Sequence, residues 1–240
     1  MRKPVRAFRV LASLLLSAVL VPVASAEPPD LELNPVTGYV ESVDIDAASG
    51  FRVRHVVDRG QGGLGTNTTI SSPSANNPRI AIESTGNTWV VWWKAGVTPE
   101  VYLRVRDLGT GTWNAETRIS NALETSRCPE IVHDGGTAWV VFEVEIGTSS
   151  VVKVTGISDG PEPIGGPLAV ASTAHAADLD VLAHSVSGHV WITWVDSETH
   201  VGWSEYDHVA ETWDVPHFES YVGTSVAAAR SAIEEAVLGQ

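Results

Sequence analysis

Three short apolar runs built around tryptophan recur along this chain at a nearly constant interval. The runs cover Asn87–Lys94, Ala138–Phe142 and Val190–Trp194. Their first tryptophans stand 50 and 52 residues apart, at Trp89, Trp139 and Trp191. A repeat of this length indicates similar supersecondary units packed one beside the next.

The apolar runs lack the alternation of a strand that has one face in water. The first run reads Trp-Val-Val-Trp-Trp, so it needs cover on both faces. Four-stranded sheets stacked radially provide that cover, and a β-propeller uses about 40 to 50 residues for each such blade. We therefore predict an all-β propeller of four-stranded blades. A β-sandwich is the competing fold, and its strands should keep one polar face.

The repeat divides the chain into consecutive segments. We expect a signal peptide at 1–26, a leader at 27–37, propeller repeats at 38–222 and a short C-terminal helix at 223–240. The repeats comprise a degenerate copy at 38–72 and three clear blades at 73–121, 122–173 and 174–222. Phe51–Arg54 lies 50 residues before Val101–Arg104 and matches it, which is why the opening segment counts as a copy.

The N-terminus has the pattern of a secretory signal. Four basic residues precede the apolar stretch Val10–Val21, and the small residues Ala24–Ala26 follow it. This pattern predicts cleavage near Ala26 and a mature chain that is secreted or periplasmic, with no membrane span. Without the four basic residues, 11 Lys and Arg stand against 29 Asp and Glu, a formal charge of −18.

The strongly acidic composition argues against nucleic acid as a partner, because phosphate groups would be repelled.

Cys128 is the single cysteine, so an internal disulfide or a cysteine zinc cluster is excluded. The segment Asp44–Gly50 has part of the pattern of a Ca²⁺ loop but lacks the third ligand and the distal glutamate, which favours a plain turn. We expect no cofactor.

Two predicted outer turns, Asp107–Trp113 and Asp207–Trp213, resemble the Asp-box (BNR repeat) of sialidase-like propellers. The resemblance covers roughly 51–220 and is approximate: the serine two positions before each aspartate is absent, and one extra residue precedes Thr-Trp. It implies structural roles for Asp107, Trp113, Asp207 and Trp213, in which the aspartate caps the turn and the tryptophan packs between blades.

The resemblance also implies what a catalytic member would need: three arginines for the substrate carboxylate, a tyrosine–glutamate nucleophile pair and an acid/base aspartate. Here Arg79 lies on a predicted inner strand, whereas four other arginines fall on third strands, away from the axis, at Arg52, Arg54, Arg104 and Arg106. An arginine triad is therefore not assembled. The expected function is carbohydrate or protein binding without catalysis. An exo-sialidase-type glycoside hydrolase and a structural fragment of a larger propeller are the alternatives.

One charged residue per blade gives a candidate binding site. Aligning the three blades on Pro78, Pro129 and Leu179 places Arg79, Glu130 and Asp180 at a shared position near the start of each inner strand. Together they would form a polar mouth for a hydroxylated or charged ligand, although solvated strand starts would give the same pattern. The expected partner is a glycan or an extracellular protein, and self-association is one way to complete a ring.

Overall fold

The structure is a computed structural model that describes residues 29–60, 65–134, 136–158, 168–173, 177–184, 189–197, 200–207 and 211–220. The expected signal peptide at 1–26 and the expected C-terminal helix at 223–240 lie outside these residues.

The described residues form four antiparallel sheets that follow one another in chain order. The first contains β1 (Asp30–Leu33), β2 (Val40–Asp46), β3 (Arg52–Asp58) and β4 (Asn67–Thr69). The second contains β5 (Ala75–Ile82), β6 (Thr88–Lys94), β7 (Glu100–Arg106) and β8 (Thr117–Arg118). The third contains β9 (Thr125–Asp134), β10 (Thr137–Ile146), β11 (Ser149–Ser158) and β12 (Leu168–Thr173). The fourth contains β13 (Ala177–His184), β14 (His189–Ser197), β15 (His200–Asp207), β16 (Thr212–Trp213) and β17 (His217–Ser220).

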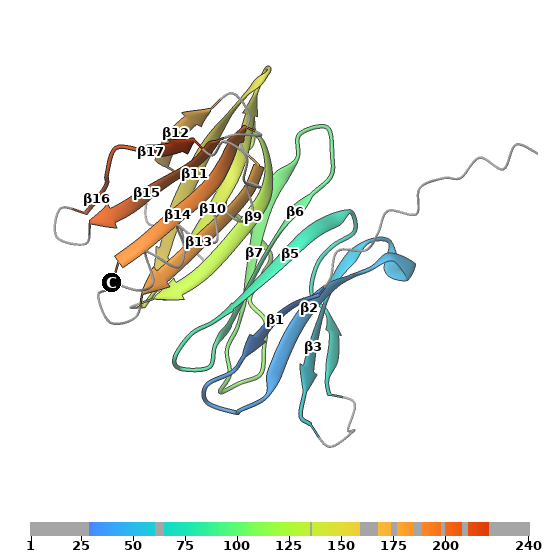
Figure 1. Cartoon of the computed structure of the whole chain (residues 1–240). Helices are drawn as coiled ribbons and strands as arrows, with labels where there is room; N and C mark the ends of the chain where they lie inside the picture. The colour runs from blue at the N-terminus through green and yellow to red at the C-terminus, as the bar shows by residue number, and fades with distance from the viewer. Residues whose placement is uncertain are drawn as a thin grey trace, which may run out of the picture.

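Figure 1 shows the four sheets fanned out from the first, in blue, to the fourth, in orange and red. Within each sheet the strands pair with their neighbours in the chain, except that β17 pairs with β15. Among the described residues, the first strands β1, β5, β9 and β13 each have one unpaired edge. These first strands lie next to one another from sheet to sheet (Figure 1).

The second strand of each inner sheet is buried on both faces by the neighbouring sheets. On β6, Trp89 and Val91 belong to the core shared with the third sheet, while Val90 and Trp92 belong to the core shared with the first. All four side chains are at most 2% exposed. On β10, the face that carries Trp139 packs against the fourth sheet. A sandwich leaves one face of such strands open, so this packing confirms the propeller and excludes the sandwich.

The first sheet differs from what the sequence predicts. The segment expected to be a leader, 27–37, contains β1, which pairs with β2 in the register Asp30–Val43 to Leu33–Val40. The first sheet is therefore a complete four-stranded sheet, whereas we expected a degenerate copy. Its β1 is only four residues long and mostly exposed, so it lacks the apolar run by which the other strands are recognised.

The outer turn of the second sheet is organised by Asp107. The Asp107 Oδ1 accepts a hydrogen bond from the Thr110 N–H at 2.6 Å, and hydrogen bonds from Thr110 lower the pKa of the Asp107 carboxyl. Trp113, at the end of this turn, packs edge-on against His55 of the first sheet, with ring centroids 5.1 Å apart. The corresponding Trp213 of the fourth sheet packs edge-on against Trp139 of the third. Each outer-turn tryptophan thus joins its own sheet to the preceding one.

Candidate functional site

The first strands of the four sheets carry a charged side chain at one equivalent register position. The position is defined by the residue that faces it on the second strand, which in the four sheets is Val43, Val91, Val141 and Thr193. The charged residues that pair with these are Asp30, Arg79, Glu130 and Asp180. We call these four residues the first-strand cluster.

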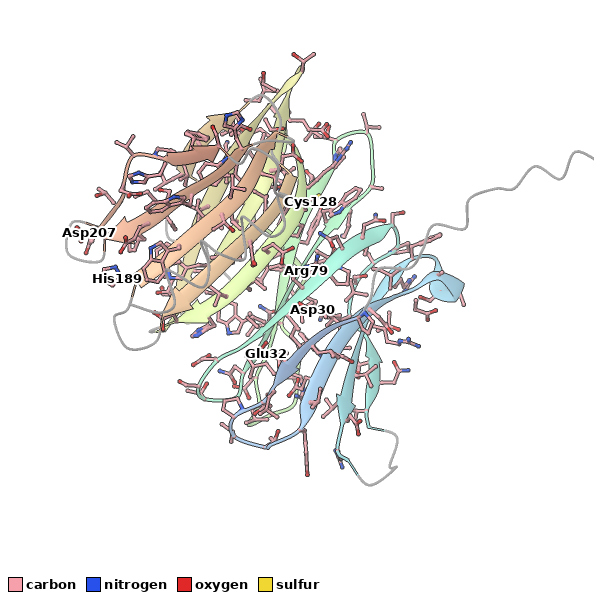
Figure 2. The ribbon with its side chains drawn as sticks, in the orientation of Figure 1. Asp30, Glu32, Arg79, Cys128, His189 and Asp207 are labelled. Carbon is pink, nitrogen blue, oxygen red and sulfur yellow. The ribbon has the colours of Figure 1, made fainter. Side chains whose placement is uncertain are left out.

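The side chains of the first-strand cluster reach from one sheet to the next. The Arg79 Nε lies 2.8 Å from each carboxylate oxygen of Glu130 on the third sheet. The Asp30 Oδ2 accepts a hydrogen bond of 2.8 Å from the backbone N–H of Ile80 on the second sheet. Figure 2 shows Asp30 and Arg79 side by side on the neighbouring strands β1 and β5. The cluster therefore links adjacent sheets along their first strands.

A β-bulge precedes the charged residue in three of the four sheets. The pairing of the first strand with the second shifts just before Arg79, Glu130 and Asp180. In the second and third sheets the bulge contains a residue with positive φ, Asn77 at 48° and Cys128 at 49°, followed by proline. A bulge leaves one residue out of the ladder and turns the strand, which tolerates a proline that cannot donate. The bulge thus sets the direction in which the next side chain points.

The electrostatics of the first-strand cluster centre on Glu130. The pKa of the Glu130 carboxyl is raised to about 7, chiefly by burial; Arg79 acts in the opposite direction, and the Asp180 and Asp30 carboxylates contribute smaller increases. Its side chain is 18% exposed, and that of Arg79 is 26% exposed. Glu130 therefore pairs with one guanidinium and lies within electrostatic reach of two further carboxylates.

The structure places all three sequence-predicted residues, Arg79, Glu130 and Asp180, at the shared position. Sequence reasoning does not find Asp30, the fourth member, because the short and mostly exposed β1 has the pattern of an extended leader. The repeat contains a signal for it, since Asp30 lies 49 residues before Arg79, close to one repeat length. Glu32, two residues further along β1, was also missed. Desolvation, and to a smaller extent the Asp30 carboxylate, raise the pKa of Glu32.

A second polar cluster lies buried between the first and second sheets. The Glu41 carboxylate lies 2.7 Å from His55 Nε2, and it accepts hydrogen bonds from Thr88 Oγ1 at 2.8 Å and Asn34 Nδ2 at 2.7 Å. All four residues are at most 1% exposed. This cluster is sealed from solvent, and the hydrogen bond from Thr88 to Glu41 joins the second sheet to the first.

The Asp44–Gly50 segment forms a turn in which both aspartates already have partners. Ala47–Ser49 is a short 3₁₀ turn, and the Asp46 side chain accepts from the Ala48 N–H at 3.1 Å. The Asp44 carboxylate forms an ion pair with Arg54. In the part of the chain that the structure describes, no group of three or more His, Cys, Asp or Glu side chains is arranged to hold a metal ion.

Comparisons with solved structures find the same fold in proteins of very different sequence. The chain superposes on a Hadza microbial sialidase with a TM-score of 0.58 at 12% identity, covering 82% of this chain and 46% of that one. For the Trypanosoma rangeli sialidase the TM-score is 0.56 at 11% identity, covering 78% and 37%. For a putative exo-β-1,3-galactanase from Bifidobacterium bifidum the TM-score is 0.52 at 11% identity, covering 80% and 70%.

These likenesses define the class of fold: the chain has a sialidase-like β-propeller fold. The chain spans less than half the length of either sialidase. No protein-family model matches the sequence, and no curated protein matches it either. Among the described residues, no helix has the length and apolarity needed to cross a membrane.

Proposed function

We propose that this chain is an exported carbohydrate-binding propeller that holds a glycan at the first-strand cluster, without catalysis. The observation that carries the proposal is the convergence of Asp30, Arg79, Glu130 and Asp180 from four sheets onto one register position. Carboxylate and guanidinium groups bind sugar hydroxyls through charge-assisted hydrogen bonds, which are stronger than neutral ones.

The likeness of the fold to sialidases and to a putative galactanase supports a carbohydrate as the ligand class. The β-bulges before the charged residues support a binding role. Charged residues that only kept the start of a strand in water would need no bulge to orient them. Export follows from the signal pattern at 1–26, and N-terminal sequencing of the exported protein should begin at Glu27.

A glycan array probed with the purified chain tests the proposal. We expect binding that Arg79→Ala and Asp180→Asn each weaken by about tenfold or more, because a hydrogen bond to a charged group contributes about 1.5–3 kcal/mol. Arg118→Ala is the matched control, because Arg118 pairs with Glu100 at 2.9 Å on the outer strands of the second sheet. Absence of any glycan binding would contradict the proposal and favour a protein surface as the partner.

A glycoside hydrolase of the exo-sialidase type is the second candidate, and the Glu130 carboxyl favours it. A general acid in glycoside hydrolysis must keep its proton near neutral pH, and burial raises the pKa of Glu130 to about 7. Assays with fluorogenic sialosides and galactosides distinguish the two candidates. Turnover that Glu130→Gln abolishes while Arg118→Ala leaves it intact would make the chain an enzyme.

A further inference from the structure

The fourth sheet, at one end of the fan in Figure 1, shares a hydrophobic core with the third sheet only, as far as the described residues go. That core contains Ile192 and Trp194 of β14. Successive side chains of a strand point to opposite faces, so the residues between them lie on the other face. We call this other face the outer face. Its described residues on β14 and β15 are Trp191, Thr193, Val195, Val201, Trp203 and Glu205.

The outer face is buried although no described sheet packs on it. Thr193 is 2% exposed, and Val201 is fully buried. Trp191 is 7% exposed. Its counterpart at the same register position of the third sheet is Trp139, which is 9% exposed and is covered by the fourth sheet. The outer face is therefore as well covered as a face between two sheets.

The first sheet shows an uncovered face at the opposite end of the fan. Leu31 and Leu33 of β1 alternate with the residues that face the second sheet, and they are 59% and 62% exposed. Side chains of a strand without a neighbouring layer thus stay in contact with water. Thr193 and Val201 are buried in a single copy of the chain, so the layer that covers them belongs to the same chain.

The segment after β17 has the position, the length and the pattern to form this layer. Because β17 pairs with β15, the chain leaves the fourth sheet at Ser220, next to the outer face. Residues 223–240 lie outside the described residues. Their apolar side chains recur at intervals of 3, 4 and 4 positions, at Val226, Ala229, Ile233 and Val237.

This spacing places the four apolar residues on one side of a helix. A helix over 223–240 would be about 27 Å long at 1.5 Å per residue. The nine residues of β14 span about 30 Å. The segment can therefore run along most of the central strand that it has to cover.

We infer that residues 223–240 form an amphipathic helix whose apolar side packs on the outer face of the fourth sheet. The helix takes the place that the following sheet occupies in the rest of the fan. The inference does not depend on the proposed function, because it concerns the cover of the fourth sheet and not the first-strand cluster.

Two aspartate substitutions in the full chain test the inference. Ile233→Asp puts a charge on the apolar side of the helix, and Ser231→Asp puts the same charge about 200° away, on its opposite side. We expect Ile233→Asp to raise the equilibrium constant of unfolding in urea at least roughly tenfold, because burying an unpaired charge is strongly unfavourable. Ser231→Asp should change this constant by less than about threefold. Equal changes in the two variants would overturn the inference.

The NMR signal of the Trp191 indole N–H tests where the segment packs. Ile233→Ala, which keeps the site uncharged if the aspartate variant does not fold, should shift this signal. The indole signal of Trp89, buried between the second and third sheets, should stay unchanged. A Trp191 signal that Ile233→Ala leaves in place would overturn the inference. A Trp191 signal that moves on dilution of the wild type, but not in Ile233→Ala, would also overturn it and assign the outer face to a second copy of the chain.

Discussion

The Glu41 carboxylate and the His55 imidazole lie 2.7 Å apart and are almost completely buried between the first and second sheets. In the first sheet, Glu41 stands two residues before Val43, which pairs with Asp30. In the second sheet, Trp89 stands two residues before Val91, which pairs with Arg79. A carboxylate therefore occupies in the first sheet the register position that tryptophan occupies in the other three. The hydrogen-bonding partners Asn34 and Thr88 make this exchange possible, because a buried charge must be paired and hydrogen-bonded.

Removing the Glu41 carboxylate should destabilise the chain strongly. Glu41→Ala removes the shared partner of His55, Thr88 and Asn34 in a sealed site, and each buried polar group left without a partner costs about 1–3 kcal/mol. Urea unfolding measures the loss. Arg118→Ala is the control, because it breaks an ion pair with Glu100 in which the arginine side chain is 44% exposed, and we expect it to lower the unfolding free energy by about 1 kcal/mol or less. Equal losses in the two variants would contradict the role of the buried network.

The Glu41 network should also make the chain sensitive to acid. Burial alone would raise the pKa of Glu41, but the hydrogen bonds from His55, Thr88 and Asn34 outweigh it and hold the pKa below the ordinary value of 4.5. A carboxyl whose pKa is lower in the folded state stabilises the fold above its ordinary pKa, and this stabilisation disappears as the pH falls through the folded value. Unfolding free energies between about pH 6 and about pH 3 should therefore fall more steeply in the wild type than in Glu41→Gln. Parallel curves would show that Glu41 does not contribute.

Glu130 should affect stability with the opposite sign. Because burial raises its pKa to about 7, the folded chain binds this proton more tightly than the unfolded chain does. The contribution is fully present below the ordinary value of 4.5 and is lost as the pH rises towards 7. Glu130→Gln should remove this part of the pH dependence.

NMR titration of the Glu130 carboxyl tests its environment directly. Arg79→Ala should raise the pKa of Glu130 further, since Arg79 is the group that lowers it. Arg118→Ala should leave the titration unchanged. An unshifted Glu130 titration in Arg79→Ala would be inconsistent with the ion pair.

The inner architecture could be predicted from the sequence because large apolar side chains on both faces of a strand admit few arrangements. Trp89 and Val90 point to opposite sides of β6, and each needs its own neighbouring sheet. The same repeat aligned Arg79, Glu130 and Asp180, since the first strands of neighbouring sheets bring equivalent positions together.

The first sheet could not be predicted in the same way, because its interface with the second sheet is partly polar. Glu41 and His55 read as solvent-facing residues in a sequence, and only the structure shows that Asn34 and Thr88 satisfy them. The pairing of Glu130 with Arg79 was likewise beyond the sequence, since alignment shows equivalence between sheets but not which side chain reaches across.

Gly202 should prove necessary for the packing of Trp194. The two residues face each other across β14 and β15, and a Cβ added at Gly202 would lie 2.3 Å from the Trp194 indole. Trp194 is fully buried in the core between the third and fourth sheets, so it has no free space to move into. Overpacking of this kind costs about 1–3 kcal/mol, and we expect that loss for Gly202→Ala in urea unfolding followed by tryptophan fluorescence.

Gly96→Ala is the control for this prediction, because the nearest atom to its added Cβ is the Thr98 carbonyl oxygen at 3.6 Å. We expect it to change the unfolding free energy by about 0.5 kcal/mol or less. Combining Gly202→Ala with Trp194→Phe tests whether the loss of stability comes from steric overlap between the new methyl group and the Trp194 indole. The smaller ring leaves room for the new methyl group, so the double variant should lose less stability than the sum of the two single losses. Strict additivity would mean that contact with Trp194 is not the reason for glycine at this position.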